Sequence, residues 1–137
     1  MSGFSIEWLN LREVSDHRAR DKRLLKKAVN WLDNLKAKDK VVVDLGSGTG
    51  STIRCLQRYT RRLPSIQWRL VDNDPQVLAE AFDRHSKECS IESFLVDLSK
   101  TQKLPLDSVS LITTSALLDL VSESFIQELC QLVKGKN

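Results

Sequence analysis

Val41-Val42-Val43-Asp44-Leu45-Gly46-Ser47-Gly48-Thr49-Gly50-Ser51 is the stretch from which the fold of this chain can be inferred. Its first residues are apolar except for one aspartate, which is typical of a short strand buried on both faces of a parallel sheet. The glycines that follow permit a turn with positive φ angles and a close approach of a ligand to the backbone. A helical pattern begins at Ser51. This order of strand, glycine turn and helix predicts a βα unit that holds a nucleotide-like ligand at the carboxyl end of the strand.

Two details of this stretch indicate the kind of ligand. The dinucleotide fingerprint G-x-G-x-x-G requires glycine at its sixth position, where this chain has Ser51. Asp44 precedes the glycines, and a fixed negative charge there suits an ammonium or sulfonium group better than a pyrophosphate. The segment from Val43 to Gly50 resembles motif I of the class I S-adenosylmethionine-dependent methyltransferases. The alternatives are a nucleotide-binding domain of the nicotinamide type and a glycine-rich turn without a ligand.

The composition is that of an ordinary globular domain. The chain has 137 residues, of which 41% are hydrophobic and 28% charged, with a formal net charge of +3. This length is sufficient for one domain with its own core. No run is long enough for a membrane span, and the N-terminus lacks the features of a signal peptide. The three cysteines are isolated, so we expect reduced thiols, no metal site and a cytoplasmic protein.

Hydrophobic periodicity predicts alternating strands and helices after an N-terminal helical region. Residues 4–14 and 22–35 have helical spacing, and residues 16–21 form a polar connection or helix start. Further strands are expected at 67–72, 91–96 and 109–114, and helices at 51–59, 75–85 and 122–134. Right-handed crossovers give the strand order 3-2-1-4. The expected fold class is therefore α/β, a Rossmann-like doubly wound parallel sheet, with a helical cap at 1–38 and an S-adenosylmethionine-binding core at 39–137.

Acidic residues also follow the second and third expected strands. A carboxylate at Asp72 offers two oxygens spaced for the vicinal hydroxyls of a ribose. The family resemblance implies that Asp97 contacts the adenine amino group and that the amide of Leu98 lies at the ring, whereas a turn or helix cap is the alternative role of Asp97. The full set of candidate cofactor-binding residues is Asp44, Gly46, Ser47, Gly48, Gly50, Asp72, Asn73, Asp97, Leu98 and Ser115.

The resemblance implies an S-adenosylmethionine-dependent methyltransferase, or its cofactor-binding half. A complete class I fold has seven strands, whereas only four are expected here, so the chain is interpreted as an incomplete, truncated form of that fold. The missing strands leave an apolar edge at Leu111 and Ile112, where self-association or a partner chain would complete the sheet. The alternative function is a catalytically inactive S-adenosylmethionine-binding module that is completed by self-association or by a partner chain.

The sequence identifies no catalytic residue. His17 is a candidate to point into the site from the cap, and His85 is expected on a helix surface. The Asn-Pro-Pro-Tyr type of motif found in amino-group methylases is absent after the fourth strand, where Thr113-Thr114-Ser115-Ala116 stands. A small-molecule acceptor is therefore favoured over a base in DNA.

The N-terminal region also carries an excess of positive charge. Residues 18–40 contain nine Lys or Arg and three Asp. Nucleic-acid binding by this segment is an alternative, less favoured than an ordinary solvated helix face. Within the segment, Arg18 and Arg20 are candidates to face the carboxylate of the ligand, a role that rests on the resemblance.

Overall fold

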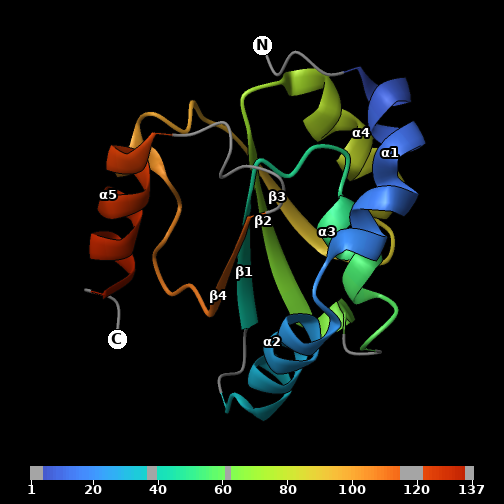
Figure 1. Ribbon diagram of the computed structural model, residues 1–137, viewed down its shortest axis with the longest axis horizontal. Helices are drawn as coiled ribbons and strands as arrows, with labels where there is room; N and C mark the ends of the chain where they lie inside the picture. Colours follow the sequence, from blue (N-terminus) through green and yellow to red (C-terminus); the bar gives the residue numbers. More distant parts are fainter. Residues whose placement is uncertain (1–4, 37–39, 61–62, 115–121, 135–137) are drawn as a thin grey trace.

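The computed structural model describes residues 5–36, 40–60, 63–114 and 122–134 (Figure 1). Four parallel strands form one sheet in the order β3-β2-β1-β4. The strands are β1 (Lys40–Leu45), β2 (Ile66–Asp72), β3 (Ser90–Leu95) and β4 (Leu111–Thr114). The predicted α/β class, parallel sheet and 3-2-1-4 order are confirmed.

Helices cover both faces of this sheet (Figure 1). One face packs against α2 (Lys22–Asn34), α3 (Ser51–Leu56) and α4 (Pro75–His85). The other face packs against α5 (Glu123–Lys134), which inserts Phe125 into the core. Every residue of β1 is buried, as expected for a central parallel strand with helices on both sides.

The N-terminal helix α1 (Ile6–Ala19) is longer than predicted. The Oγ of Ser5 caps it by accepting a hydrogen bond from the Trp8 amide at 3.1 Å. The polar segment 16–21, expected as a connection or helix start, is helical as far as Ala19, and an i,i+4 ion pair at 3.1 Å joins Asp16 to Arg12 one turn before it. The backbone of Arg20 is extended and ends α1, and the side chain of Asp21 then caps the N-terminus of the next helix.

Smaller departures concern element ends. The α3 helix stops at Leu56 and continues to Tyr59 only as turns, because the Tyr59 amide donates to the Leu56 carbonyl at 2.9 Å. The β4 strand begins at Leu111 instead of Val109. At the preceding position the Oγ of Ser110 accepts from the Val41 amide at 3.1 Å, so a side chain replaces the strand's own carbonyl in the ladder.

Both outer strands have one unpaired edge within the described residues. There β3 pairs only with β2, and β4 pairs only with β1. The predicted open edge at the fourth strand is therefore present among these residues, with Leu111 and Ile112 half-buried. None of the described helices has the length and apolarity needed to cross a membrane.

Candidate ligand-binding site

The glycine turn follows β1 and lies against the end of β2. Gly46, Gly48 and Gly50 have φ angles of 68°, 54° and 97°, in the left-handed region that favours glycine. The amides of Gly46 and Ser47 donate to the Val71 carbonyl at 2.8 and 3.1 Å. Gly50 then caps α3, so the predicted order of strand, turn and helix is confirmed.

Asp44 lies below this turn with only 1% of its surface exposed. Its Oδ1 accepts hydrogen bonds from the hydroxyls of Thr113 at 2.7 Å and Thr52 at 3.3 Å. Burial raises the pKa of Asp44 to about 6, although these hydrogen bonds and the positive charge of Arg20 favour the ionised form. Its Oδ2 is buried without a hydrogen-bond partner among the described residues, and so is the Oγ of Ser47. A buried acceptor in this state is costly unless a ligand or water satisfies it.

Asp72 lies at the end of β2 and contacts the turn directly. Its Oδ2 accepts from the Gly48 amide at 2.9 Å, and its Oδ1 accepts from the Asp74 amide at 3.1 Å. Burial raises its pKa against the effect of these backbone hydrogen bonds. Asn73 beside it is exposed, and Asp74 caps α4 as predicted, with its Oδ1 2.9 Å from the Gln76 amide. The structure thus brings Asp72 and the glycine turn together.

The other predicted site residues have different surroundings. Asp97 is exposed, and its Oδ1 accepts from the Ser99 amide at 2.9 Å. That hydrogen bond is the main cause of the lowered pKa of Asp97. This contact matches the turn-cap alternative for Asp97. Leu98 packs at the margin of the α5-side core, and Ser115 lies outside the described residues.

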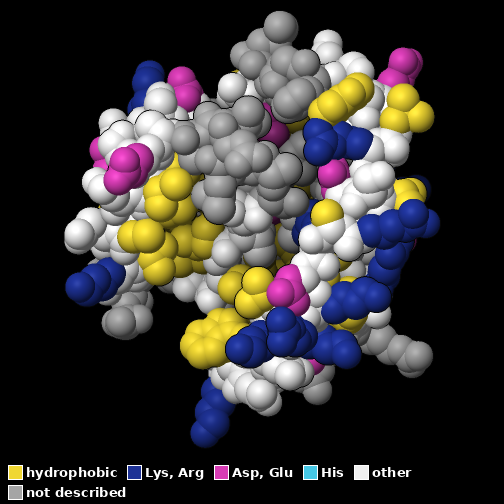
Figure 2. Space-filling model, viewed as in Figure 1, with side chains coloured by type: hydrophobic (Ala, Val, Ile, Leu, Met, Phe, Trp, Pro, Cys, Tyr) yellow, Lys and Arg dark blue, Asp and Glu magenta, His cyan; other side chains and the backbone are white. Residues whose placement is uncertain are grey.

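The helical cap approaches the turn from the other side. His17 places its Nε2 3.2 Å from the Oγ and 3.3 Å from the carbonyl of Ser51. Partial burial is the main cause of the lowered pKa of His17. Arg20 donates to the hydroxyls of Ser51 and Thr52 at 3.4 Å. Arg18 is exposed, so of these two candidates Arg20 is the one that contacts the turn side of α3. Lys and Arg side chains gather on the surface over α1 and α2 (Figure 2).

The prediction that His85 lies on a helix surface is wrong. Only 5% of its surface is exposed, and a Cβ added at Gly50 would lie 2.8 Å from its Cδ2. The signal was available, because His85 follows Leu78 and Ala81 at the helical spacing that defines the buried face of α4. The sequence interpretation also gave no role to Glu13 or Arg54, which contact each other beside the turn.

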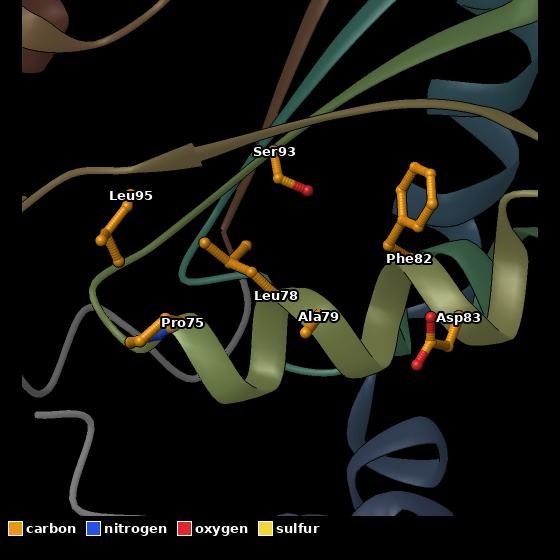
Figure 3. A pocket seen from close by; sticks show the side chains of 7 residues that line it. All are labelled: Pro75, Leu78, Ala79, Phe82, Asp83, Ser93 and Leu95. Carbon is orange, nitrogen blue, oxygen red and sulfur yellow. The ribbon is translucent and has the colours of Figure 1, made fainter.

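A hollow lies at the β3 edge of the sheet, between α4 and β3 (Figure 3). It has a volume of about 360 Å³ and is mainly apolar, with Leu78 and Phe82 of α4 facing Ser93 and Leu95 of β3. None of the predicted site residues lines it. Among the described residues, no three His, Cys, Asp or Glu side chains gather as a metal site.

The fold of this chain is similar to the folds of several methyltransferases of known structure. The chain is similar to the plantazolicin methyltransferase BpumL in complex with S-adenosylhomocysteine, with 16% identity, a TM-score of 0.57 and coverage of 90% of this chain and 47% of that one. For phosphoethanolamine N-methyltransferase 1 of Haemonchus contortus the identity is 22%, the TM-score 0.53 and the coverage 83% and 23%. For an S-adenosylmethionine-dependent methyltransferase of Aquifex aeolicus the identity is 18%, the TM-score 0.51 and the coverage 85% and 64%.

These similarities concern the fold, and the chain spans less than two thirds of the length of each of these three proteins. No protein-family model matches the sequence, and no curated protein matches it. The four described strands have the Rossmann-like arrangement found in these methyltransferases, as the resemblance to motif I predicted.

Proposed function

We propose that this chain is the S-adenosylmethionine-binding part of a methyltransferase. The observation that carries the proposal is the buried Asp44 carboxylate, whose Oδ2 has no hydrogen-bond partner among the described residues and lies beside the glycine turn. A ligand ammonium group is a suitable partner for it, because an ammonium offers charge and several donors at once. The fold similarity to S-adenosylmethionine-dependent enzymes supports the same ligand.

Residues near the glycine turn support a proposed contact for each end of such a ligand. We assign the amino-acid end to Asp44 and Ser47, the two side chains with unsatisfied buried oxygens, and we assign the ligand carboxylate to Arg20, which donates to Ser51 and Thr52 beside the turn. We assign the ribose hydroxyls to Asp72, whose two carboxylate oxygens would also keep accepting from the Gly48 and Asp74 amides. Asn73, Asp97, Leu98 and Ser115 remain proposed contacts for the ribose and adenine.

When bound, S-adenosylmethionine supplies a methyl group that an acceptor removes from sulfur by in-line displacement. The contribution of the chain is to hold the ligand in one orientation and to exclude water, mainly through the glycine turn and the α1 cap. His17 contacts Ser51, the first residue after the glycine turn, and we assign it no proton transfer. We propose a small-molecule acceptor, because the Asn-Pro-Pro-Tyr type of motif is absent after β4.

The alternative function is a catalytically inactive module that binds the same ligand and is completed at the β4 edge by a second copy or a partner chain. Its supporting observation is that, in the described part of the chain, β4 pairs on one side only. The division into a cap at 1–38 and a core at 39–137 belongs to the same proposal. A cytoplasmic location is proposed from the free thiols of Cys55, Cys89 and Cys130.

Isothermal titration with S-adenosylmethionine, S-adenosylhomocysteine and NAD tests the ligand class. We expect binding of the two sulfur compounds and none of NAD. Binding of NAD alone would make the nicotinamide alternative correct. The variant Asp107→Asn serves as a control that should bind these ligands as the original chain does, because this exposed carboxylate lies on a loop that contacts Arg69.

A further inference from the structure

Arg54 in α3 joins three separate parts of the molecule. Its Nε donates to the two carboxylate oxygens of Glu13 in α1 at 2.9 and 3.0 Å, and its Nη2 also contacts Glu13. Its Nη1 donates to the Thr49 carbonyl at 2.8 Å, and its Nη2 donates to the Thr49 hydroxyl at 3.0 Å. Thr49 lies between the last two glycines of the turn. The guanidinium therefore links the cap helix to the ligand-binding turn.

The third contact of Arg54 is with α4. Its Nη1 lies 2.8 Å from the Nε2 of His85. Because a guanidinium only donates, this nitrogen of His85 has to be the acceptor, and the ring proton lies on Nδ1. The side chains of Arg54 and Glu13 are 18% and 23% exposed, so the contacts form at a largely desolvated junction.

Only arginine has the donors for this arrangement. The guanidinium presents five N–H groups in a rigid planar fork, and here they are directed to acceptors on α1, on the turn and on α4. A lysine at this position would keep the charge, but its single nitrogen would not reach both sides. The contacts thus depend on the shape of the side chain as well as on its charge.

The cap depends on such polar contacts because α1 buries none of its residues. Besides the contact of Glu13, His17 of α1 contacts Ser51 and Asn10 of α1 contacts Arg84. Leu9 lies over the turn, since a Cβ added at Gly48 would be 3.7 Å from its Cδ1. The residues that dock α1 on the core therefore also contact the glycine turn or the residues that hold it.

We infer that Arg54 is a positioning residue that couples docking of the α1 cap to the ligand-binding conformation of the glycine turn. Glu13 fixes the guanidinium from one side, and the guanidinium fixes Thr49 from the other. Loss of the Glu13 contact then loosens the turn, although Glu13 does not itself touch it. This inference rests on the proposed function, in which the turn binds S-adenosylmethionine.

The test compares Glu13→Gln, Arg54→Lys and a matched control, Arg84→Lys. The control weakens another contact between α1 and α4, with Asn10, and Arg84 has no hydrogen bond to the turn. Amide hydrogen exchange of the ligand-free chain is measured for residues 6–19, 46–52 and 66–72, and the Kd for S-adenosylhomocysteine is measured by titration.

We expect Glu13→Gln and Arg54→Lys to raise exchange in α1 and in residues 46–52 together, with exchange in β2 unchanged. The Kd should rise by roughly 3- to 30-fold, the range for loss of a partly exposed charge-assisted contact. Arg84→Lys should raise exchange in α1 only. A general loss of stability would also move β2, so that measurement separates positioning from folding.

The coupling is overturned if Glu13→Gln raises exchange in α1 while the turn and the Kd stay as in the original chain. It is also overturned if Arg84→Lys loosens the turn as much as Glu13→Gln does. If the original chain binds no S-adenosylhomocysteine but the exchange of α1 and the turn changes together, the proposed function fails and the coupling stands. If Arg54→Lys does not fold, the milder Glu13→Gln variant still decides the question.

Discussion

The buried carboxylate of Asp44 should make the stability of the ligand-free protein fall as the pH rises. Its folded pKa of about 6 lies above the ordinary value of 3.8, so folding favours the neutral acid. The stabilising effect of this neutral form is fully present below pH 3.8 and is lost as the pH rises through 6. A difference of about two pH units, at about 1.4 kcal/mol each, corresponds to about 3 kcal/mol.

The substitution Asp44→Asn tests this magnitude. Asparagine keeps an acceptor oxygen for the hydroxyls of Thr113 and Thr52 but does not titrate. The free energy of unfolding is measured by urea denaturation at pH 4 and pH 7.5 for both proteins. The fixed cost of the new amide cancels when the two pH values are compared.

We expect the variant to gain about 2–3 kcal/mol relative to the original chain between these two pH values. A gain below about 0.5 kcal/mol would show that Asp44 is ionised at little cost, as for a hydrated carboxylate. The inference of a buried acceptor that awaits a cationic ligand would then be wrong. Asp107→Asn, on the surface, serves as the control for replacing an aspartate by asparagine.

Four further outcomes follow from the same contacts. Affinity for S-adenosylmethionine, titrated between pH 5 and pH 7.5, should increase as Asp44 ionises, since the carboxylate then meets the ligand ammonium; a flat profile contradicts that pairing. Asp72→Ala should weaken the ligand by about 1.5–3 kcal/mol through lost charge-assisted hydrogen bonds, and an unchanged Kd refutes the ribose role. Asp97→Ala should leave the unfolding midpoint nearly unchanged. A large rise in the Kd of this variant for S-adenosylmethionine would then indicate an adenine contact, and an unchanged Kd would indicate a turn cap. Burial alone raises the pKa of Glu13, but the hydrogen bond and charge of Arg54 lower it below 4.5. Docking of α1 should therefore be complete above about pH 4.5 and be lost as the pH falls through the lowered pKa. Hydrogen exchange of α1 measured across this pH range checks the loss.

The central part of the fold was predictable from local sequence. Three β-branched residues followed by three alternating glycines permit few conformations other than a buried strand and a left-handed turn. The order of the four strands followed from crossover handedness. The helix that starts at Pro75 was predictable because Asp74 and Pro75 together form a cap and first turn.

The junction around Arg54 was not predictable in the same way. Its contacts join residues 13, 49 and 85, which are far apart in the chain, and no local pattern specifies such an ion pair. An arginine in an amphipathic helix is normally a solvent-facing residue. His85 differs, because its helical spacing did indicate burial and the interpretation gave too much weight to its place near the end of α4.

The acidic residues at the strand ends differ in how well their surroundings match the roles that the family resemblance implies. Asp44 and Asp72 are both buried at the turn, because β1 and β2 are neighbours and their carboxyl ends meet there. Asp97 follows β3, one strand further from β1, and its carboxylate contacts its own turn. A ligand that reaches from Asp44 to Asp97 therefore has to extend along the ends of three strands, which is the arrangement expected for an adenosyl group joined to an amino acid. The Asp97→Ala titration is the measurement that decides whether the ligand extends that far.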